Sequence, residues 1–91
     1  MIKLKISVVL PAKNEVGAVG ETIKRIKQLN LVSEILIVND GSTDNTKEIA
    51  ELAGAKVISH PYSKGNGAAI KTGARHAIGD VIIFMDADGQ H

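Results

Sequence analysis

The stretch Ile35-Leu36-Ile37-Val38-Asn39-Asp40-Gly41-Ser42 decides the fold, because a short continuous apolar run leads directly into a polar turn. Strands that are buried on both faces of a parallel sheet have this continuous pattern, whereas half-buried strands alternate. Three further runs of the same kind occupy residues 6–10, 55–58 and 81–85. We therefore predict four buried strands in one parallel sheet.

The intervals between the apolar runs carry helical patterns. We predict helices over residues 17–30, 44–53 and 66–77. In the first, Val19, Ile23 and Ile26 share one face, and in the second, Asn45 and Glu48 have the spacing of a capping box. The resulting order, β-α-β-α-β-α-β, predicts an α/β fold: a Rossmann-like open parallel sheet with right-handed crossovers and helices on both faces.

The composition narrows the functional classes. The 91 residues suffice for one small domain, and the net charge is +1 with only two aromatic residues, Tyr62 and Phe84. This leaves neither a basic stripe nor a stacking platform, so we expect no nucleic-acid partner. The sequence contains no cysteine and no visible signal peptide, and its first apolar run stops at Pro11, too early to span a membrane. We expect a cytoplasmic protein.

Polar residues follow three of the predicted strands. These segments are Pro11-Ala12-Lys13-Asn14-Glu15, Asn39-Asp40-Gly41-Ser42, and a final stretch that contains Asp86, Asp88, Gln90 and His91. In an open α/β sheet, ligands bind outside the carboxyl ends of the strands. The three segments therefore predict a binding rim that is rich in carboxylates.

Asp86-Ala87-Asp88 places two carboxylates two residues apart, so that both face one side of an extended chain. Hard oxygen ligands of this kind suit Mg²⁺ or Mn²⁺ shared with phosphate oxygens; the alternative is a solvated acidic turn. Asp40 either accepts hydrogen bonds from a nucleobase or ribose, or forms the turn that starts the second helix. Asn14 and Glu15 are open to a ligand role or to a role at the start of the first helix.

A glycine-rich turn, Lys64-Gly65-Asn66-Gly67, precedes the third predicted helix. Ile70 breaks both the dinucleotide and the Walker templates. Two interpretations remain for the basic residues nearby: they lie close to a bound diphosphate, or they are solvated on the surface. These residues are Lys64, Lys71 and Arg75. We expect His60 and His76 to be structural or solvent-facing and to lie away from the rim.

Four motifs together resemble family 2 glycosyltransferases, and in particular the dolichyl-phosphate mannosyltransferase and polyprenyl-phosphate glycosyltransferase branch. They are Val8-Val9-Leu10-Pro11-Ala12-Lys13-Asn14-Glu15, Val38-Asn39-Asp40-Gly41-Ser42-Thr43-Asp44, Lys64-Gly65-Asn66-Gly67-Ala68-Ala69-Ile70-Lys71-Thr72-Gly73, and Met85-Asp86-Ala87-Asp88-Gly89-Gln90-His91. The match spans the whole chain in order. The sequence departs from the family pattern at Lys13, Asn39 and Gly89, which bears on base stacking and on nucleotide or sugar preference.

The resemblance implies a GT-A fold, of which residues 1–91 form the donor-binding half. It implies that the nucleotide is contacted by Pro11, Ala12, Asn14, Glu15, Asp40 and Asp86, and that Mg²⁺ or Mn²⁺ is held by Asp86, Asp88 and Gln90. It further implies inverting transfer from a UDP- or GDP-sugar, with a polyprenyl-phosphate acceptor at the cytoplasmic face of a membrane. The acceptor half and the catalytic base are expected beyond residue 91.

Two alternatives remain open at this point. A haloacid-dehalogenase-like phosphatase also has a strand followed by Asp-x-Asp-Gly, whose first carboxylate attacks phosphorus. There the motif opens the domain and is followed by Thr or Val, whereas here Gln90 follows Gly89. The second alternative is a non-catalytic nucleotide-binding or interaction module, which would form a homodimer through the exposed edge of its sheet.

Overall fold

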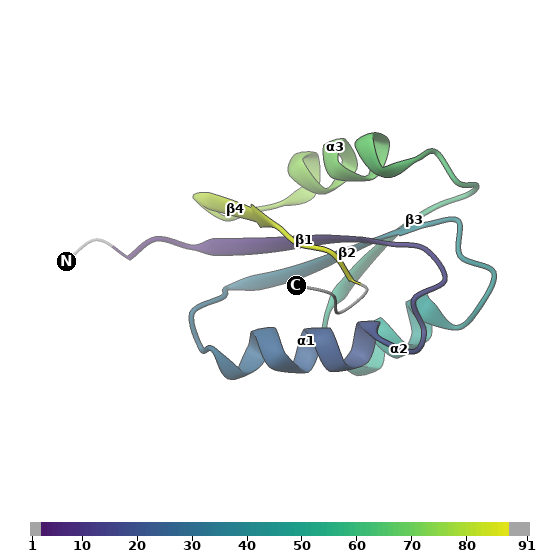
Figure 1. Cartoon of the computed structure of the whole chain (residues 1–91). Helices are drawn as coiled ribbons and strands as arrows, with labels where there is room; N and C mark the ends of the chain where they lie inside the picture. Colours follow the sequence, from purple (N-terminus) through teal and green to yellow (C-terminus); the bar gives the residue numbers. More distant parts are fainter. Residues whose placement is uncertain (1–2, 88–91) are drawn as a thin grey trace.

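The computed structural model describes residues 3–87, which form seven elements in the predicted order (Figure 1). The elements are β1 (Ile6–Ala12), α1 (Val19–Gln28), β2 (Glu34–Asp40), α2 (Thr46–Leu52), β3 (Lys56–His60), α3 (Asn66–His76) and β4 (Val81–Phe84). The predicted alternation of strands and helices is therefore confirmed. β1 and β2 extend two residues further at their carboxyl ends than the apolar runs indicated, which brings the polar residues Asn39 and Asp40 into the sheet.

The sheet has the strand order β3-β2-β1-β4, and every pairing is parallel. β1 lies between β2 and β4, so that Val8 is level with Ile35 on one side and with Ile83 on the other. The chain thus proceeds outward from β1 through β2 to β3 and then returns to the opposite side of β1. This reversal creates a topological switch point between β1 and β4, where open α/β sheets bind ligands.

Helices cover both faces of the sheet, as predicted: α1 and α2 lie on one face and α3 lies on the other (Figure 1). The core therefore has two layers. The larger layer, beneath α1 and α2, contains the buried side chains Val8, Leu10, Val19, Ile23, Ile26, Ile35, Ile37 and Ala87. The smaller layer, beneath α3, contains Val9, Leu36, Val38 and Ala69. Alternate residues of β1 and β2 supply the two layers, which explains why their sequences are continuously apolar.

α3 starts at Asn66 as predicted, whereas α1 and α2 each start two residues later than the sequence indicated. α1 begins at Val19 rather than at residue 17, because a turn precedes it in which the Glu15 carbonyl accepts hydrogen bonds from the amides of Ala18 and Val19. The capping box predicted for α2 is wrong, since the side chain of Asn45 makes no capping hydrogen bond. Instead, Oδ1 of Asp44 accepts from the Thr46 amide at 3.0 Å and from the Thr46 hydroxyl.

β4 forms one edge of the sheet and is less covered than the other strands. The side chains of Val81, Ile83 and Phe84 remain 39%, 43% and 44% exposed, whereas the residues of β2 are all buried. The reason is that α3 packs against β1 and β2. Within residues 3–87, no helix combines the length and the apolar character that a membrane span requires.

Candidate functional site

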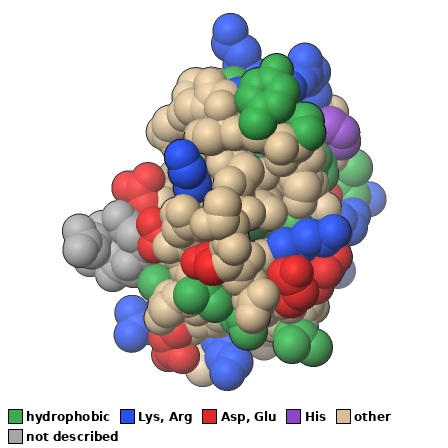
Figure 2. Space-filling view, turned by 90° about the vertical axis from the view of Figure 1, so that its right-hand side faces the viewer, with side chains coloured by type: hydrophobic (Ala, Val, Ile, Leu, Met, Phe, Trp, Pro, Cys, Tyr) green, Lys and Arg blue, Asp and Glu red, His purple; other side chains and the backbone are tan. Residues whose placement is uncertain are grey.

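A cavity of about 320 Å³ lies at the carboxyl ends of the strands, at the switch point between β1 and β4. It is lined by Pro11, Ala12, Lys13, Glu15, Asp40, Ser63, Gly65, Asn66, Ala69, Asp86 and Ala87. Five of the six residues predicted for the nucleotide are among them, and Asn14 is not. Figure 2 faces this end of the molecule and shows a mainly polar surface on which acidic side chains lie at separate places.

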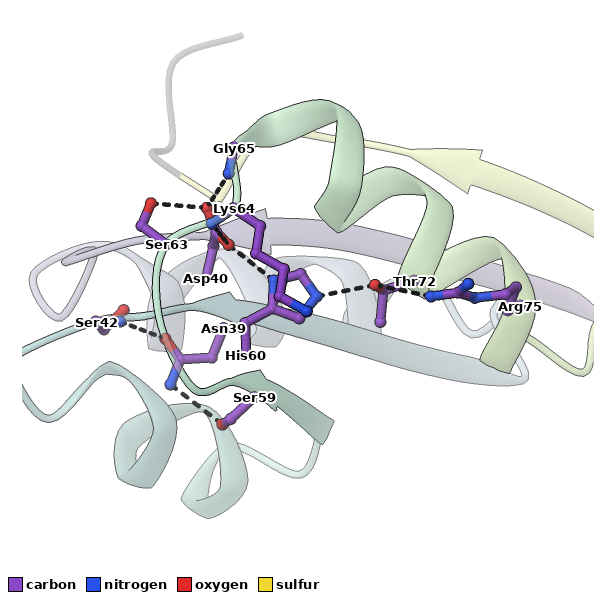
Figure 3. Close-up of polar contacts among 10 residues, drawn as sticks. All are labelled: Asn39, Asp40, Ser42, Ser59, His60, Ser63, Lys64, Gly65, Thr72 and Arg75. Carbon is purple, nitrogen blue, oxygen red and sulfur yellow. Dashed lines mark hydrogen bonds and ion pairs between the residues drawn. The ribbon is translucent and has the colours of Figure 1, made fainter.

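Asp40, at the end of β2, is buried and is held by four hydrogen bonds within the chain (Figure 3). Its Oδ1 accepts from Nδ1 of His60 and from the Lys64 amide, both at 2.8 Å. Its Oδ2 accepts from the Gly65 amide at 3.0 Å and from the Ser63 hydroxyl at 3.1 Å. Burial alone would raise the pKa of Asp40, but the hydrogen bonds from His60, Lys64, Gly65 and Ser63 outweigh it, and the pKa falls to about 2.

These contacts give Asp40 a role that the sequence did not indicate. Neither of the alternatives considered for it, contact with a nucleoside or the turn before α2, involves the segment at residues 63–65. The carboxylate fastens that segment, which precedes α3, to the end of β2. Asp40 therefore shapes the cavity that it also lines.

Asn14 is also used inside the chain. Its Oδ1 accepts from the Thr43 amide at 2.8 Å, and its own amide donates to the Ser42 hydroxyl at 2.9 Å. Its φ of 53° lies in the left-handed region, where Asn is tolerated better than most residues. Asn14 thus joins the segments that follow β1 and β2 and supports the rim from outside the cavity.

Glu15 combines a structural backbone with a side chain on the cavity. Its amide donates to the hydroxyl of the buried Thr46 at 2.9 Å, while its half-buried side chain is part of the lining. Asn39 has a different position: its Oδ1 accepts from the Ser42 amide at 3.2 Å and its Nδ2 donates to the Ser59 hydroxyl at 3.3 Å (Figure 3). Asn39 is not among the lining residues and instead joins the segment after β2 to the end of β3.

The expectation for the two histidines is partly wrong. His60 is structural, but it does not lie away from the rim, because it contacts Asp40 directly and is only 8% exposed. Its Nε2 lies 2.8 Å from the hydroxyl of Thr72 on α3. His76 is exposed, and its Nδ1 lies 2.9 Å from the Thr72 carbonyl oxygen. Asp40 and Thr72 lie 20 and 12 positions from His60 in the sequence, so no local sequence signal predicts these contacts.

Of the basic residues near α3, none lines the cavity. The ammonium of Lys64 lies 5.4 Å from the centre of the Tyr62 ring, and Nη2 of Arg75 lies 3.5 Å from the Thr72 hydroxyl. Lys71 is exposed on α3. Lys13 does line the cavity, at the position where the family pattern often has an aromatic residue.

The metal prediction rests on three residues, of which Asp86 alone lies within the described part of the chain. Asp86 is exposed and lines the cavity, and the next residue, Ala87, is buried in the core. Its carboxylate is a hard oxygen donor that fits Mg²⁺ or Mn²⁺. Asp88 and Gln90 lie outside the described residues, and residues 3–87 alone contain no group of three His, Cys, Asp or Glu residues that could hold an ion.

The sequence model of glycosyl transferase family 2 matches residues 7–91, which are 85 of the 91 residues. The chain belongs to glycosyl transferase family 2. The match runs through all of the rim segments and favours the glycosyltransferase hypothesis over the phosphatase alternative.

Relatives of this family 2 chain include both named enzymes and an uncharacterized protein. The chain is 44% identical to an uncharacterized protein of Methanocaldococcus jannaschii, over 98% of the chain and 37% of that protein. It is 40% identical to the glucosyl-3-phosphoglycerate synthase of Mycolicibacterium smegmatis, over 91% of the chain and 30% of the enzyme. It is 36% identical to a dolichyl-phosphate β-glucosyltransferase of Trichomonas vaginalis, over 92% of the chain and 30% of that enzyme.

Solved structures confirm the predicted fold class. The mannosyl-3-phosphoglycerate synthase of Rubrobacter xylanophilus matches with a TM-score of 0.87 and 33% identity, over 93% of this family 2 chain and 31% of that one. A second match is the glucosyl-3-phosphoglycerate synthase of Mycobacterium tuberculosis, solved in complex with Mn²⁺, UDP-glucose and phosphoglyceric acid. The TM-score is 0.83 and the identity 35%, over 92% of this chain and 33% of that enzyme. The chain thus spans about a third of the length of these relatives.

Proposed function

We propose that this chain is the donor-binding part of a glycosyltransferase that uses a nucleotide-diphospho-sugar. The observation that carries the proposal is the cavity at the switch point, where the end of β1, the end of β2 and Asp86 after β4 meet around one space. Its volume is at the lower end of the range for small-molecule sites. Membership of glycosyl transferase family 2 supports a nucleotide that carries a sugar as the ligand, rather than a nucleotide without one.

The donor that we propose is a UDP-sugar. A relative that is 35% identical has been solved with UDP-glucose and Mn²⁺, and a further complex of that enzyme contains UDP and Mg²⁺. In this chain the nucleoside would lie against Pro11, Ala12 and Glu15, with Asp40 as the deepest polar group of the lining. Asn14 would act through the loops that it joins.

A divalent cation, Mg²⁺ or Mn²⁺, is part of the proposal. Asp86, Asp88 and Gln90 would hold it, and the cation would neutralise the charge of the departing diphosphate. In the transfer, the bond between the anomeric carbon and the diphosphate oxygen breaks, and a bond from the acceptor oxygen to that carbon forms with inversion. If the attacking oxygen is a hydroxyl, its proton would go to a base beyond residue 91, whereas an ionised phosphate oxygen carries no proton to transfer.

For the acceptor we propose a molecule that carries a phosphate group. The names of the relatives contain both 3-phosphoglycerate and dolichyl phosphate. Transfer assays on the whole protein with 3-phosphoglycerate and with a polyprenyl phosphate, each offered with radiolabelled UDP-glucose, distinguish the two. A product with the polyprenyl phosphate alone would place the reaction at a membrane surface, and the anomeric coupling constant of either product tests the inversion.

The donor site is tested by calorimetric titration of the chain with UDP-glucose and GDP-mannose, with and without Mn²⁺. We expect UDP-glucose to bind better in the presence of Mn²⁺, and Asp88→Ala to abolish that gain. Glu51→Ala is the matched control, because Glu51 is an exposed carboxylate on α2, away from the cavity. Binding that is equally tight in chelator would refute the metal assignment, and no binding of either nucleotide sugar would refute the donor site.

Dimerisation through the sheet edge stays a second proposal, and it rests on the exposed side chains of β4: Val81, Ile83 and Phe84. An unpaired strand edge with apolar side chains is a template for pairing with another strand. Sedimentation velocity of the chain at several concentrations tests it. A monomer at every concentration would contradict the dimer, and Ile83→Lys should dissociate one if it forms.

A further inference from the structure

A buried polar chain runs from β2 through β3 to α3, on the side of the sheet that α3 covers (Figure 3). His60 is its centre: the ring contacts Asp40 through Nδ1 and Thr72 through Nε2, both at 2.8 Å. All three side chains are buried, with exposures of 8% or less. Buried hydrogen-bonding groups of this kind hold a fixed geometry, because breaking one contact leaves its partner unsatisfied in the interior.

The hydrogen-bond directions follow from the charge on Asp40. The carboxylate is ionised at neutral pH, since its pKa is about 2, so Nδ1 of His60 must donate to it. With Nδ1 protonated, Nε2 accepts from the Thr72 hydroxyl in the neutral ring. At the other end of the chain, Nη2 of Arg75 donates to the Thr72 hydroxyl at 3.5 Å.

The groups that this chain fixes form one wall of the cavity. Asp40 holds the amides of Lys64 and Gly65 immediately before α3, and His60 holds Thr72 in the middle of that helix. Ser63, Gly65, Asn66 and Ala69 are the lining residues that come from this segment. In addition to the apolar packing of α3, two polar contacts therefore attach the wall to the sheet, and His60 contributes to both.

Two close approaches show how little freedom the wall has. A Cβ on Gly41, whose φ is +73°, would lie 2.5 Å from the Ser63 amide nitrogen. A Cβ on Gly73 would overlap Cγ1 of Val9. Glycine at both positions allows the segment and the helix to approach the sheet closely, and within that space the His60 contacts set the orientation.

We infer that His60 is a positioning residue for the nucleotide: through its charge-assisted contact with Asp40 it orients the segment at residues 63–65, which forms part of the wall against which the donor binds, while its contact with the uncharged Thr72 hydroxyl contributes less. This inference rests on the proposed donor site. His60 itself does not line the cavity, so it acts on the ligand through these partners.

Paired substitutions separate its two contacts. In His60→Asn, the shorter amide can donate to Asp40 in place of Nδ1, but it does not reach Thr72. In His60→Gln, the longer amide can reach Thr72 in place of Nε2. It then leaves Asp40 without the hydrogen bond that Nδ1 of His60 donates. His60→Phe removes both contacts and keeps the ring volume. Glu51→Ala serves again as the control.

Two measurements are made on each variant of the chain. Without ligand, NMR amide exchange reports the protection of Lys64 and Gly65 relative to core amides such as that of Ile37. Calorimetric titration with UDP and Mg²⁺, well below the unfolding temperature, reports affinity. We expect His60→Asn to keep both values within about threefold, and His60→Gln and His60→Phe to lose roughly tenfold or more in each, the effect of one lost charge-assisted hydrogen bond.

The outcomes decide the inference. Selective loss in His60→Gln, with core protection unchanged and with rescue in His60→Asn, supports it, because a merely structural histidine would weaken both variants alike. Two results would overturn it. One is an equal loss of affinity and protection in His60→Asn and His60→Gln, in proportion to the fall in their unfolding temperatures. The other is full affinity and protection in His60→Gln. If the unmodified chain binds no UDP, the proposed function fails, and the ligand-free exchange data still decide whether His60 orients the segment.

Discussion

Replacing Asp40 by Asn should make the protein less stable at neutral pH and also less sensitive to acid. The pKa of Asp40 is about 2 in the folded chain, against an ordinary value of 3.8. Each pH unit by which folding lowers a pKa corresponds to about 1.4 kcal/mol, so the ionised form of Asp40 contributes roughly 2 kcal/mol to folding. Solvent screening reduces this little, because the residue is only 6% exposed.

The sign follows from the direction of the shift. A carboxyl group whose pKa is lowered on folding contributes its full stabilisation above its unfolded pKa, near 4, and loses it as the pH falls through about 2. The amide side chain of the Asp40→Asn variant cannot ionise, so that variant lacks this pH-dependent contribution. The difference in unfolding free energy between the two proteins should therefore be about 2–3 kcal/mol from pH 7 down to pH 5 and should shrink toward pH 2.

Urea unfolding followed by circular dichroism at pH 7, 5, 4, 3 and 2 measures this difference. Glu34, whose pKa is also lowered although burial opposes the effect, titrates in both proteins and cancels from the comparison. Glu51→Gln is the control for removing a carboxylate without hydrogen bonds of this kind. A gap that stays constant down to pH 2, or a variant as stable as the original at pH 7, would refute the argument that the carboxylate holds residues 63–65 through its charge.

Two further substitutions test the close approaches that shape the cavity wall. Gly41→Ala should lower the free energy of unfolding, measured in urea, by roughly 2 kcal/mol or more. The residue has a φ of +73°, and a Cβ there would lie 2.5 Å from the Ser63 amide nitrogen. A loss below about 0.5 kcal/mol would contradict that packing. Gly73→Ala should lower the free energy of unfolding by about 1–3 kcal/mol, because the added methyl group overpacks against Val9. A double-mutant cycle with Val9→Ala should show a favourable coupling of at least about 0.5 kcal/mol. Additive effects would show that α3 shifts freely.

The class of fold and the residues that follow the strands could be predicted from local signals along the chain. Continuous apolar runs and helical periodicity are local signals, so the β-α-β-α-β-α-β order and the parallel sheet could be predicted from them. The same holds for Pro11, Glu15 and Asp86, since a position directly after a buried parallel strand is a position on the carboxyl rim. The roles of Asp86, Asp88 and Gln90 as metal ligands stay predictions.

The contacts that join distant segments could not be predicted in this way, because they depend on the packing of whole elements. The capping prediction for Asn45 was wrong, because Ser, Asp and Asn side chains compete for the same amides and small differences in geometry choose the winner. The partners of Asp40 lie 20 to 25 residues further along the chain, and His60 meets Asp40 and Thr72 only because β3 pairs with β2 and α3 brings Thr72 within 2.8 Å of the ring. Strand order brings these groups together, and strand order depends on how whole elements pack, which no short stretch of sequence records.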